Sequence, residues 1–193
     1  QPTIKTKLGI GLIWLKVPPD GEDMYAKKLT YDQVANRILN YHRPYHKKLK
    51  LILKNTYDKY KCFFHVNCHS MQNNASAMST QEKGTLRPDF VIGDRDGTSC
   101  NKKFTNLVVT ILKDLNYDVV LNDPYKGMEL VSAYSNPANN KHSLQIEVNR
   151  KLYMDEKTRI KTDGFNVLKE HLSLMIREIK QFVEKELRWM TLD

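Results

Sequence analysis

Four ionisable residues stand in or just after one short predicted strand. Residues 143–150, SLQIEVNR, alternate apolar and polar side chains, which is typical of a β-strand. Glu147 and Arg150 lie in this segment, and Asp155 and Glu156 follow it. A carboxylate and a guanidinium at the end of a buried strand are costly unless they pair or act chemically. The cluster therefore indicates either an ion pair that fixes a turn or a site that acts on a substrate.

A second candidate for chemistry is the imidazole of His69, which follows the apolar segment 61–67. A histidine and a carboxylate suit metal-assisted hydrolysis, in which zinc activates a water and a glutamate carries protons. A single histidine is more often a hydrogen-bonded structural residue, and His65 on the same segment competes for the role. The motifs HExxH and GxSxG and a phosphate-binding glycine loop are absent, which weighs against those chemistries.

Polar residues follow each of the four predicted strands, which lie near residues 61–67, 90–92, 117–121 and 143–150. Helical patterns alternate with these strands, which favours an α/β fold with a mostly parallel or mixed sheet flanked by helices. Ligands of such sheets bind beyond the carboxyl ends of the strands. We therefore expect four polar sets to meet at one edge: Asn67, His69 and Ser70; Asp94, Arg95 and Asp96; Asn122, Tyr125 and Lys126; and Glu147, Asn149 and Arg150.

A long helix is expected from Thr30 onward. Thr30 and Gln33 match a capping box, and apolar residues then recur every three or four positions as far as Ile52. Pro44 interrupts the pattern and is expected to kink the helix. The basic side chains beside it are either solvated or form a positive patch at the mouth of a site.

Composition narrows the class of protein. The 193 residues, 40% hydrophobic and 27% charged, suit one globular domain. No apolar run of about 18 residues indicates a membrane span, and no signal peptide is visible. The net charge of +9 would attract nucleic acid or a small anionic substrate. Because no RNA-binding or zinc-finger motif is present, the small anion is favoured and nucleic acid is disfavoured.

The three cysteines, Cys62, Cys68 and Cys100, form no CxxC motif, and an odd count favours free thiols in a reducing compartment. Cys68 adjoins His69, which suggests a thiol nucleophile. Adjacent residues of a strand point to opposite sides, however, so we expect Cys68 to be a small buried side chain.

Several sequence blocks together resemble those of N-formylglutamate amidohydrolases. The blocks are YHRPYH (41–46), NCHSM (67–71), RPDFVIGDR (87–95), GTSC (97–100), NDPYKG (122–127) and residues 142–156. The resemblance implies a single domain over residues 1–193 with a zinc-peptidase-like core of the phosphorylase/hydrolase type. It also implies hydrolysis of N-formyl-L-glutamate, or a related N-acyl amino acid, to formate and an amino acid. A cytoplasmic location and a role in histidine degradation go with that activity.

The resemblance also implies roles for single residues. Glu147 matches the general base that activates the water, and His69 matches a ligand of Zn²⁺. An anionic N-acyl amino acid would be held by basic and polar side chains, arginine doing so through a bidentate fork. The substrate-binding candidates are Arg150, Arg95, Lys126, Asn122 and Tyr125.

The chain also departs from the pattern of that family. The family carries an upstream His-Ser-Gly motif and an acidic pair that look like two further metal ligands, and nothing before Trp14 supplies them. Position 67 is Asn where the family usually has Asp, and Met128 replaces a usual Gly. We therefore expect either a chain lacking an N-terminal part of the family fold or a divergent member, with weak zinc binding and weak activity. The alternative function is a binding protein for an anionic amino-acid derivative.

Overall fold

The computed structural model describes residues 3–190, which divide into two compact units. One unit comprises the residues up to 52 together with 74–86, and the other comprises residues 53–73 and those from 87 onward. The division does not test the predicted single amidohydrolase-like domain, which stays a prediction. Within residues 3–190, no helix combines the length and the apolar composition needed to cross a bilayer.

The first unit contains short elements and the start of a long helical segment. Its short elements are α1 (Ile4–Lys7) and the antiparallel pair β1 (Lys16–Val17) and β2 (Glu22–Asp23). The helical segment consists of α2 (Tyr31–Arg37), the π-helical turn η1 (Ile38–His42) and α3 (Arg43–Tyr60).

The capping box at the start of α2 is confirmed. The Thr30 hydroxyl accepts the Gln33 N–H at 3.3 Å, and the Gln33 side chain accepts the Thr30 N–H at 3.0 Å. The irregularity expected at Pro44 is the π-helical turn η1, which ends two residues before it. Proline cannot donate to the carbonyl four residues earlier, and Asn40, which carries that carbonyl, lies inside the turn.

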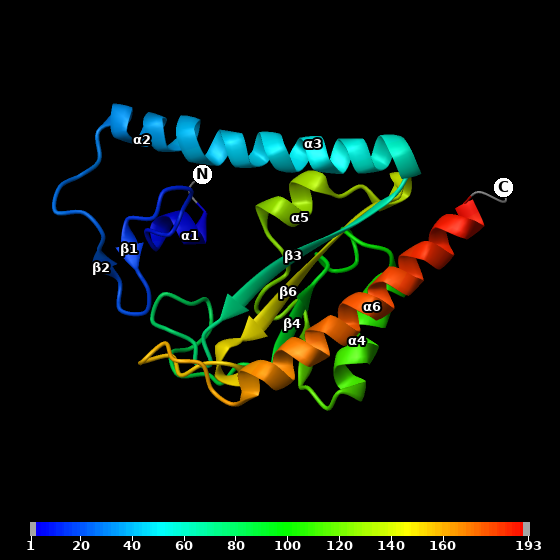
Figure 1. Cartoon of the computed structure of the whole chain (residues 1–193). Coiled ribbons are helices and arrows are strands. Elements are labelled where there is room, and N and C mark those ends of the chain that lie inside the picture. Colours follow the sequence, from blue (N-terminus) through cyan, green and yellow to red (C-terminus); the bar gives the residue numbers. More distant parts are fainter. Residues whose placement is uncertain (1–2, 191–193) are drawn as a thin grey trace. The chain divides into compact units, whose positions relative to one another are not determined.

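The second unit is built on a four-stranded mixed sheet (Figure 1). Its strands lie in the order β3-β6-β4-β5. Their bounds are β3 (Phe63–Met71), β4 (Phe90–Gly93), β5 (Val119–Leu121) and β6 (Lys141–Asn149). β3 runs parallel to β6, β4 runs parallel to β5, and β4 and β6 are antiparallel. The predicted α/β class with a mixed sheet flanked by helices is confirmed.

The antiparallel pairing of β4 with β6 shows that the four strands do not all end at one edge of the sheet, as the sequence had predicted. β3 and β6 end at the same edge, whereas β4 and β5 end at the opposite edge. In the register, Gly93 at the end of β4 lies beside Gln145, in the middle of β6. The residues that follow β4 and β5 therefore start from the edge opposite to the one where β3 and β6 end, so the four polar sets do not all meet at one edge. Alternation of helices and strands in a sequence does not fix strand direction, which is why the expectation failed.

One face of this sheet forms the core with α4 (Lys102–Asp114) and α6 (Gly164–Met190). Its buried residues include Phe90, Ile92, Leu144 and Ile146 from the strands and Phe104, Val108, Leu112, Leu168 and Met175 from the helices. Successive side chains of a strand alternate between faces, so the intervening residues of β3 and β6 lie on the other face. These residues are mostly polar. The remaining elements are α5 (Glu129–Tyr134), which contacts β6, and the 3₁₀ turns η2 (Pro137–Asn139) and η3 (Arg150–Leu152).

Candidate active site

His69 and Glu147 lie side by side on the polar face of the sheet. The parallel register pairs His69 with Glu147 and Asn67 with Gln145. Asn67 Nδ2 is 3.0 Å from His69 Nε2 and donates to Gln145 Oε1 at 3.5 Å. Gln145 Nε2 in turn donates to Glu147 Oε1 at 2.9 Å. A continuous row of polar contacts therefore joins the imidazole to the carboxylate.

The two groups differ in their access to solvent. Glu147 is only 6% exposed, whereas His69 is exposed, because β3 lies at the end of the strand order and β6 lies inside it. The same position explains a correction: Cys68 is exposed rather than buried as expected. Its side chain alternates with those of Asn67 and His69, so the structure does not present it beside Glu147 on the polar face.

The loop after β5 carries Tyr125 to this face. A Cβ atom on Gly93 would lie 2.7 Å from backbone atoms of Tyr125, Lys126 and Gly127, so the loop passes directly over Gly93. Gly93 is the register partner of Gln145, which places the loop over the row of polar side chains. No side chain larger than a hydrogen atom fits between strand and loop at this position.

Three charged residues act on the phenol of Tyr125. Burial raises the pKa of Tyr125, the positive charges of Arg87 and Arg150 lower it, and the negative charge of Glu147 raises it further. Glu147, Tyr125 and the two guanidinium groups therefore share one part of the molecule. A carboxylate beside cations and a hydroxyl can take up a proton next to a bound anion.

Arg150 is held at the end of β6 by two contacts. Its Nε donates to the hydroxyl of Ser70 at 3.1 Å, and its Nη1 lies 3.7 Å from Oε1 of Glu156. Glu156 is itself fixed, because its Oε2 accepts the backbone N–H of Asn73 at 3.0 Å. The contacts join the ends of β3 and β6, so that the position of the guanidinium depends on both strands.

Arg87 is a member of this group that sequence reasoning missed. Because β4 is antiparallel to β6, the residues before β4 lie at the edge where β6 ends. Arg87 is 5% exposed, its Nη1 donates to the Gln72 carbonyl at 3.2 Å, and its guanidinium carbon lies 5.4 Å from the centroid of the Tyr125 ring. In the sequence, Arg87 begins the block RPDFVIGDR and precedes an apolar strand, and its position becomes informative once the strand direction is known.

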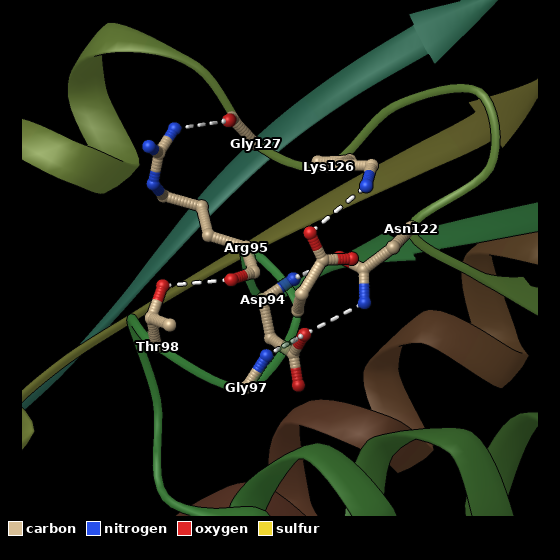
Figure 2. A network of polar contacts seen from close by, with 8 residues as sticks. Asp94, Arg95, Gly97, Thr98, Asn122, Lys126 and Gly127 are labelled. Atoms are coloured by element: carbon tan, nitrogen blue, oxygen red, sulfur yellow. Dashed lines mark hydrogen bonds and ion pairs between the residues drawn. The ribbon is translucent and has the colours of Figure 1, made fainter.

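Asn122 lies in a different network, beyond the ends of β4 and β5 (Figure 2). It exchanges two hydrogen bonds with Asp94, from Asn122 Nδ2 to Asp94 Oδ1 at 2.8 Å and from the Asp94 N–H to Asn122 Oδ1 at 3.0 Å. The buried Asp94 carboxylate also accepts the N–H of Gly97 at 2.8 Å and the hydroxyl of Thr105 at 3.1 Å. These contacts join the two loops to each other and to α4.

Arg95 and Lys126 belong to the same network (Figure 2). Arg95 Nη1 donates to the carbonyl of Gly127 at 3.1 Å, and the Lys126 ammonium pairs with the Asp96 carboxylate at 2.9 Å. The structure therefore places Arg95, Lys126 and Asn122 at the edge away from His69, and brings together Glu147, Tyr125, Arg150 and His69. The predicted substrate-binding roles stay predictions.

The described residues do not form a zinc site. A catalytic zinc ion usually takes three protein ligands. Among residues 3–190, no group of three or more His, Cys, Asp and Glu side chains could hold a metal ion. The imidazole of His69 is 3.0 Å from the neutral amide of Asn67, which is not a ligand that zinc prefers.

Comparisons with known proteins agree with this architecture. The family model for N-formylglutamate amidohydrolase matches residues 1–154. An N-formylglutamate deformylase from Pseudomonas putida is 26% identical over 148 residues, which are 76% of this chain and 52% of the relative. The crystal structure of N-formylglutamate amidohydrolase from Ralstonia eutropha JMP134 is similar with a TM-score of 0.89 and 40% identity, over 96% of this chain and 66% of that chain. The chain thus spans about half the length of the curated relative and about two thirds of the solved structure.

Proposed function

The chain belongs to the N-formylglutamate amidohydrolase family, and from this premise we propose that it hydrolyses the amide bond of N-formyl-L-glutamate or of a related N-acyl amino acid. The products are formate, or another carboxylic acid, and the free amino acid. The observation that carries the proposal is the buried carboxylate of Glu147, in register with His69 and grouped with Tyr125 and Arg150.

Glu147 is the general base of the proposed reaction. Its buried carboxylate removes a proton from a water whose oxygen bonds to the acyl carbon. The carbon–nitrogen bond then breaks, and Glu147 passes the proton to the leaving amine. The hydrogen bond from Gln145 Nε2 to Oε1 orients the Glu147 carboxylate.

Arg150 and Tyr125 hold the substrate in this proposal. The guanidinium binds a carboxylate of the anionic amino acid, and the phenol donates to an oxygen of the acyl group. Arg95, Asn122 and Lys126 remain candidates for substrate contacts, since their network borders the loop that carries Tyr125.

Zinc dependence is proposed separately, on the strength of the family resemblance. Zinc supplies an activated water and polarises a carbonyl group in hydrolases that contain it. His69 would provide one ligand, and because the described residues provide no set of three, no step above depends on the metal. The cytoplasmic location and the role in histidine degradation rest on the resemblance alone.

The proposal is tested by measuring formate release from N-formyl-L-glutamate, with and without added Zn²⁺, for the wild-type chain and Glu147→Gln. We expect low activity in the wild type and a further loss of about 100-fold or more in the variant, because the base is removed while its shape is kept. Glu129→Gln, at an exposed position in the first turn of α5, is the matched control and should keep wild-type activity. Equal rates for wild type and Glu147→Gln would reject the role of Glu147.

A binding protein for an anionic amino-acid derivative is the second candidate function. It is favoured by Asn67 and Met128, which stand where the family usually has Asp and Gly. Calorimetric titration with N-formyl-L-glutamate separates the two functions. Heat of binding without formate release, at any Zn²⁺ concentration, would favour the binding protein.

A further inference from the structure

We propose that Glu156 is a positioning residue, which orients the guanidinium of Arg150 toward a carboxylate of the substrate. The inference rests on the proposed function, in which Arg150 binds that carboxylate. Glu156 takes no part in the proposed hydrolytic steps, and this inference gives it a role in substrate binding.

The first step of the argument is how Arg150 is held. Guanidinium presents five N–H donors in a rigid fork. The contacts with Ser70 and Glu156 engage Nε and Nη1, and the guanidinium makes no other hydrogen bond or ion pair within residues 3–190. The Arg150 side chain is 35% exposed, so part of it is accessible to a ligand. These two contacts restrict the guanidinium to one orientation, whereas an unrestrained arginine samples many.

The second step is how Glu156 is held. Its Oε2 accepts the backbone N–H of Asn73, two residues beyond the end of β3. Its Oε1 is buried and, among the described residues, has no hydrogen-bond partner, while Nη1 of Arg150 lies 3.7 Å away. A buried carboxylate oxygen is costly without a compensating charge, and the guanidinium provides it. Glu156 therefore links the backbone after β3 to the side chain of Arg150.

The third step is the relation of Arg150 to the reacting groups. Arg150 follows Glu147 by three residues, and both charges act on the Tyr125 phenol. A substrate whose carboxylate pairs with Arg150 is thereby placed near Glu147 and Tyr125. Because reactivity falls steeply when a bound group shifts by about 1 Å, a guanidinium that wanders would weaken productive binding.

Removing the negative charge of Glu156 could either tighten or weaken the binding of an anionic ligand. The direction of the change distinguishes a positioning role from a purely electrostatic one. If Glu156 acted only as a nearby anion, its loss would remove a negative charge that offsets the charge of Arg150. The binding of an anionic ligand would then become tighter. If Glu156 positions Arg150, its loss weakens binding. Glu156→Gln is the suitable variant, since Gln keeps an oxygen for the Asn73 N–H and loses only the charge.

The experiment measures the dissociation constant of N-formyl-L-glutamate by calorimetry for wild type, Glu156→Gln, Arg150→Met and the double variant. We expect Glu156→Gln to weaken binding about three- to tenfold and Arg150→Met to weaken it more, a range typical of a partly exposed charged contact. The double variant should bind like Arg150→Met alone, because a residue that acts through Arg150 has no further effect once Arg150 is gone.

Asp155→Asn is the matched control. Asp155 is the adjacent carboxylate, but it accepts the N–H groups of Lys157 and Thr158 and so only stabilises the local turn. The Asp155→Asn variant should bind N-formyl-L-glutamate as tightly as the wild type does.

Three results would overturn the inference: unchanged or tighter binding by Glu156→Gln, a further loss in the double variant, or no binding by the wild type. Normal binding without formate release would instead overturn the hydrolytic proposal and leave the inference standing. If Arg150→Met binds as the wild type does, the assignment of Arg150 fails, and the role of Glu156 fails with it.

Discussion

At the scale of single residues, the environment of each side chain decides which of two neighbours can do chemistry. Cys68 and His69 are adjacent, yet His69 lies in register with Glu147, whereas the side chain of Cys68 alternates to the other face. Although Cys68 is exposed, surrounding protein atoms partly desolvate its thiol and raise its pKa, which lowers the fraction of reactive thiolate at neutral pH. Both observations weigh against a thiol nucleophile.

The cysteines provide a direct prediction at this scale. Burial raises the pKa of Cys62 to about 11 and that of Cys100 to about 12, and both side chains are buried, whereas Cys68 is exposed. With a thiol reagent at pH 7.5, we expect Cys68 to react slowly and the other two to react only after unfolding. Cys68→Ser should abolish the reaction of the native protein and leave formate release unchanged. Loss of activity in Cys68→Ser would contradict the assignment.

At the scale of secondary-structure elements, the fit between β4 and the loop after β5 controls the position of Tyr125. We predict that Gly93→Ala destabilises the protein by about 1–3 kcal/mol, since the new methyl group would lie 2.7 Å from loop backbone that cannot rotate away. The displaced loop should also weaken binding of N-formyl-L-glutamate. Urea unfolding and calorimetry measure the two effects.

Gly84→Ala is the control for this prediction. Gly84 has a φ of +91° but open space around it, and it lies outside the network that joins the loops after β4 and β5, so its substitution costs about 1–2 kcal/mol of backbone strain without moving the Tyr125 loop. Ligand binding should be unaffected. Equal effects of the two substitutions on ligand binding would show that close packing at Gly93 does not position Tyr125.

The half-buried His65 in β3 and the buried His142 in β6 predict how stability depends on pH. Burial lowers the pKa of His65 and of His142, so the folded protein takes up their protons less readily than the unfolded chain does. Stability is therefore complete above the ordinary histidine pKa of 6.5 and falls as the pH drops below it. We expect the free energy of unfolding to fall steadily between pH 7 and pH 5. Urea titrations should show the effect, and His142→Gln should make it smaller; an unchanged slope would contradict the assignment.

The elements also show what a sequence can and cannot reveal. The alternation in residues 143–150 correctly located the end of β6, and the pattern at Thr30 correctly located the start of α2. Strand direction depends on contacts between residues far apart in the sequence, so the antiparallel β4 was not foreseen. Because β4 was expected to run parallel to β6, Arg95 and Asn122 were expected at the same edge as Arg150. Arg87, which precedes β4, was not recognised as a neighbour of that site.

At the scale of the whole molecule, the net charge of +9 acts on every anion that approaches. A positive field raises the local concentration of a small dicarboxylate and also attracts nucleic acid without sequence preference. The two partners differ in how salt affects them. Screening of a few charges changes affinity modestly, whereas release of ions from many phosphates gives a steep dependence.

The final prediction uses this difference. Between about 20 and 500 mM NaCl, the dissociation constant of N-formyl-L-glutamate should rise about fivefold, a slope of about 0.5 in a plot of log affinity against log salt, because only the few charges of a small ligand are screened. A labelled 20-nucleotide RNA, followed by fluorescence anisotropy, should bind only at low salt. Tight RNA binding at 150 mM NaCl, with a slope of several units, would show that the positive charge serves nucleic acid. The site around Glu147 and Arg150 would then no longer account for the basic character of the chain.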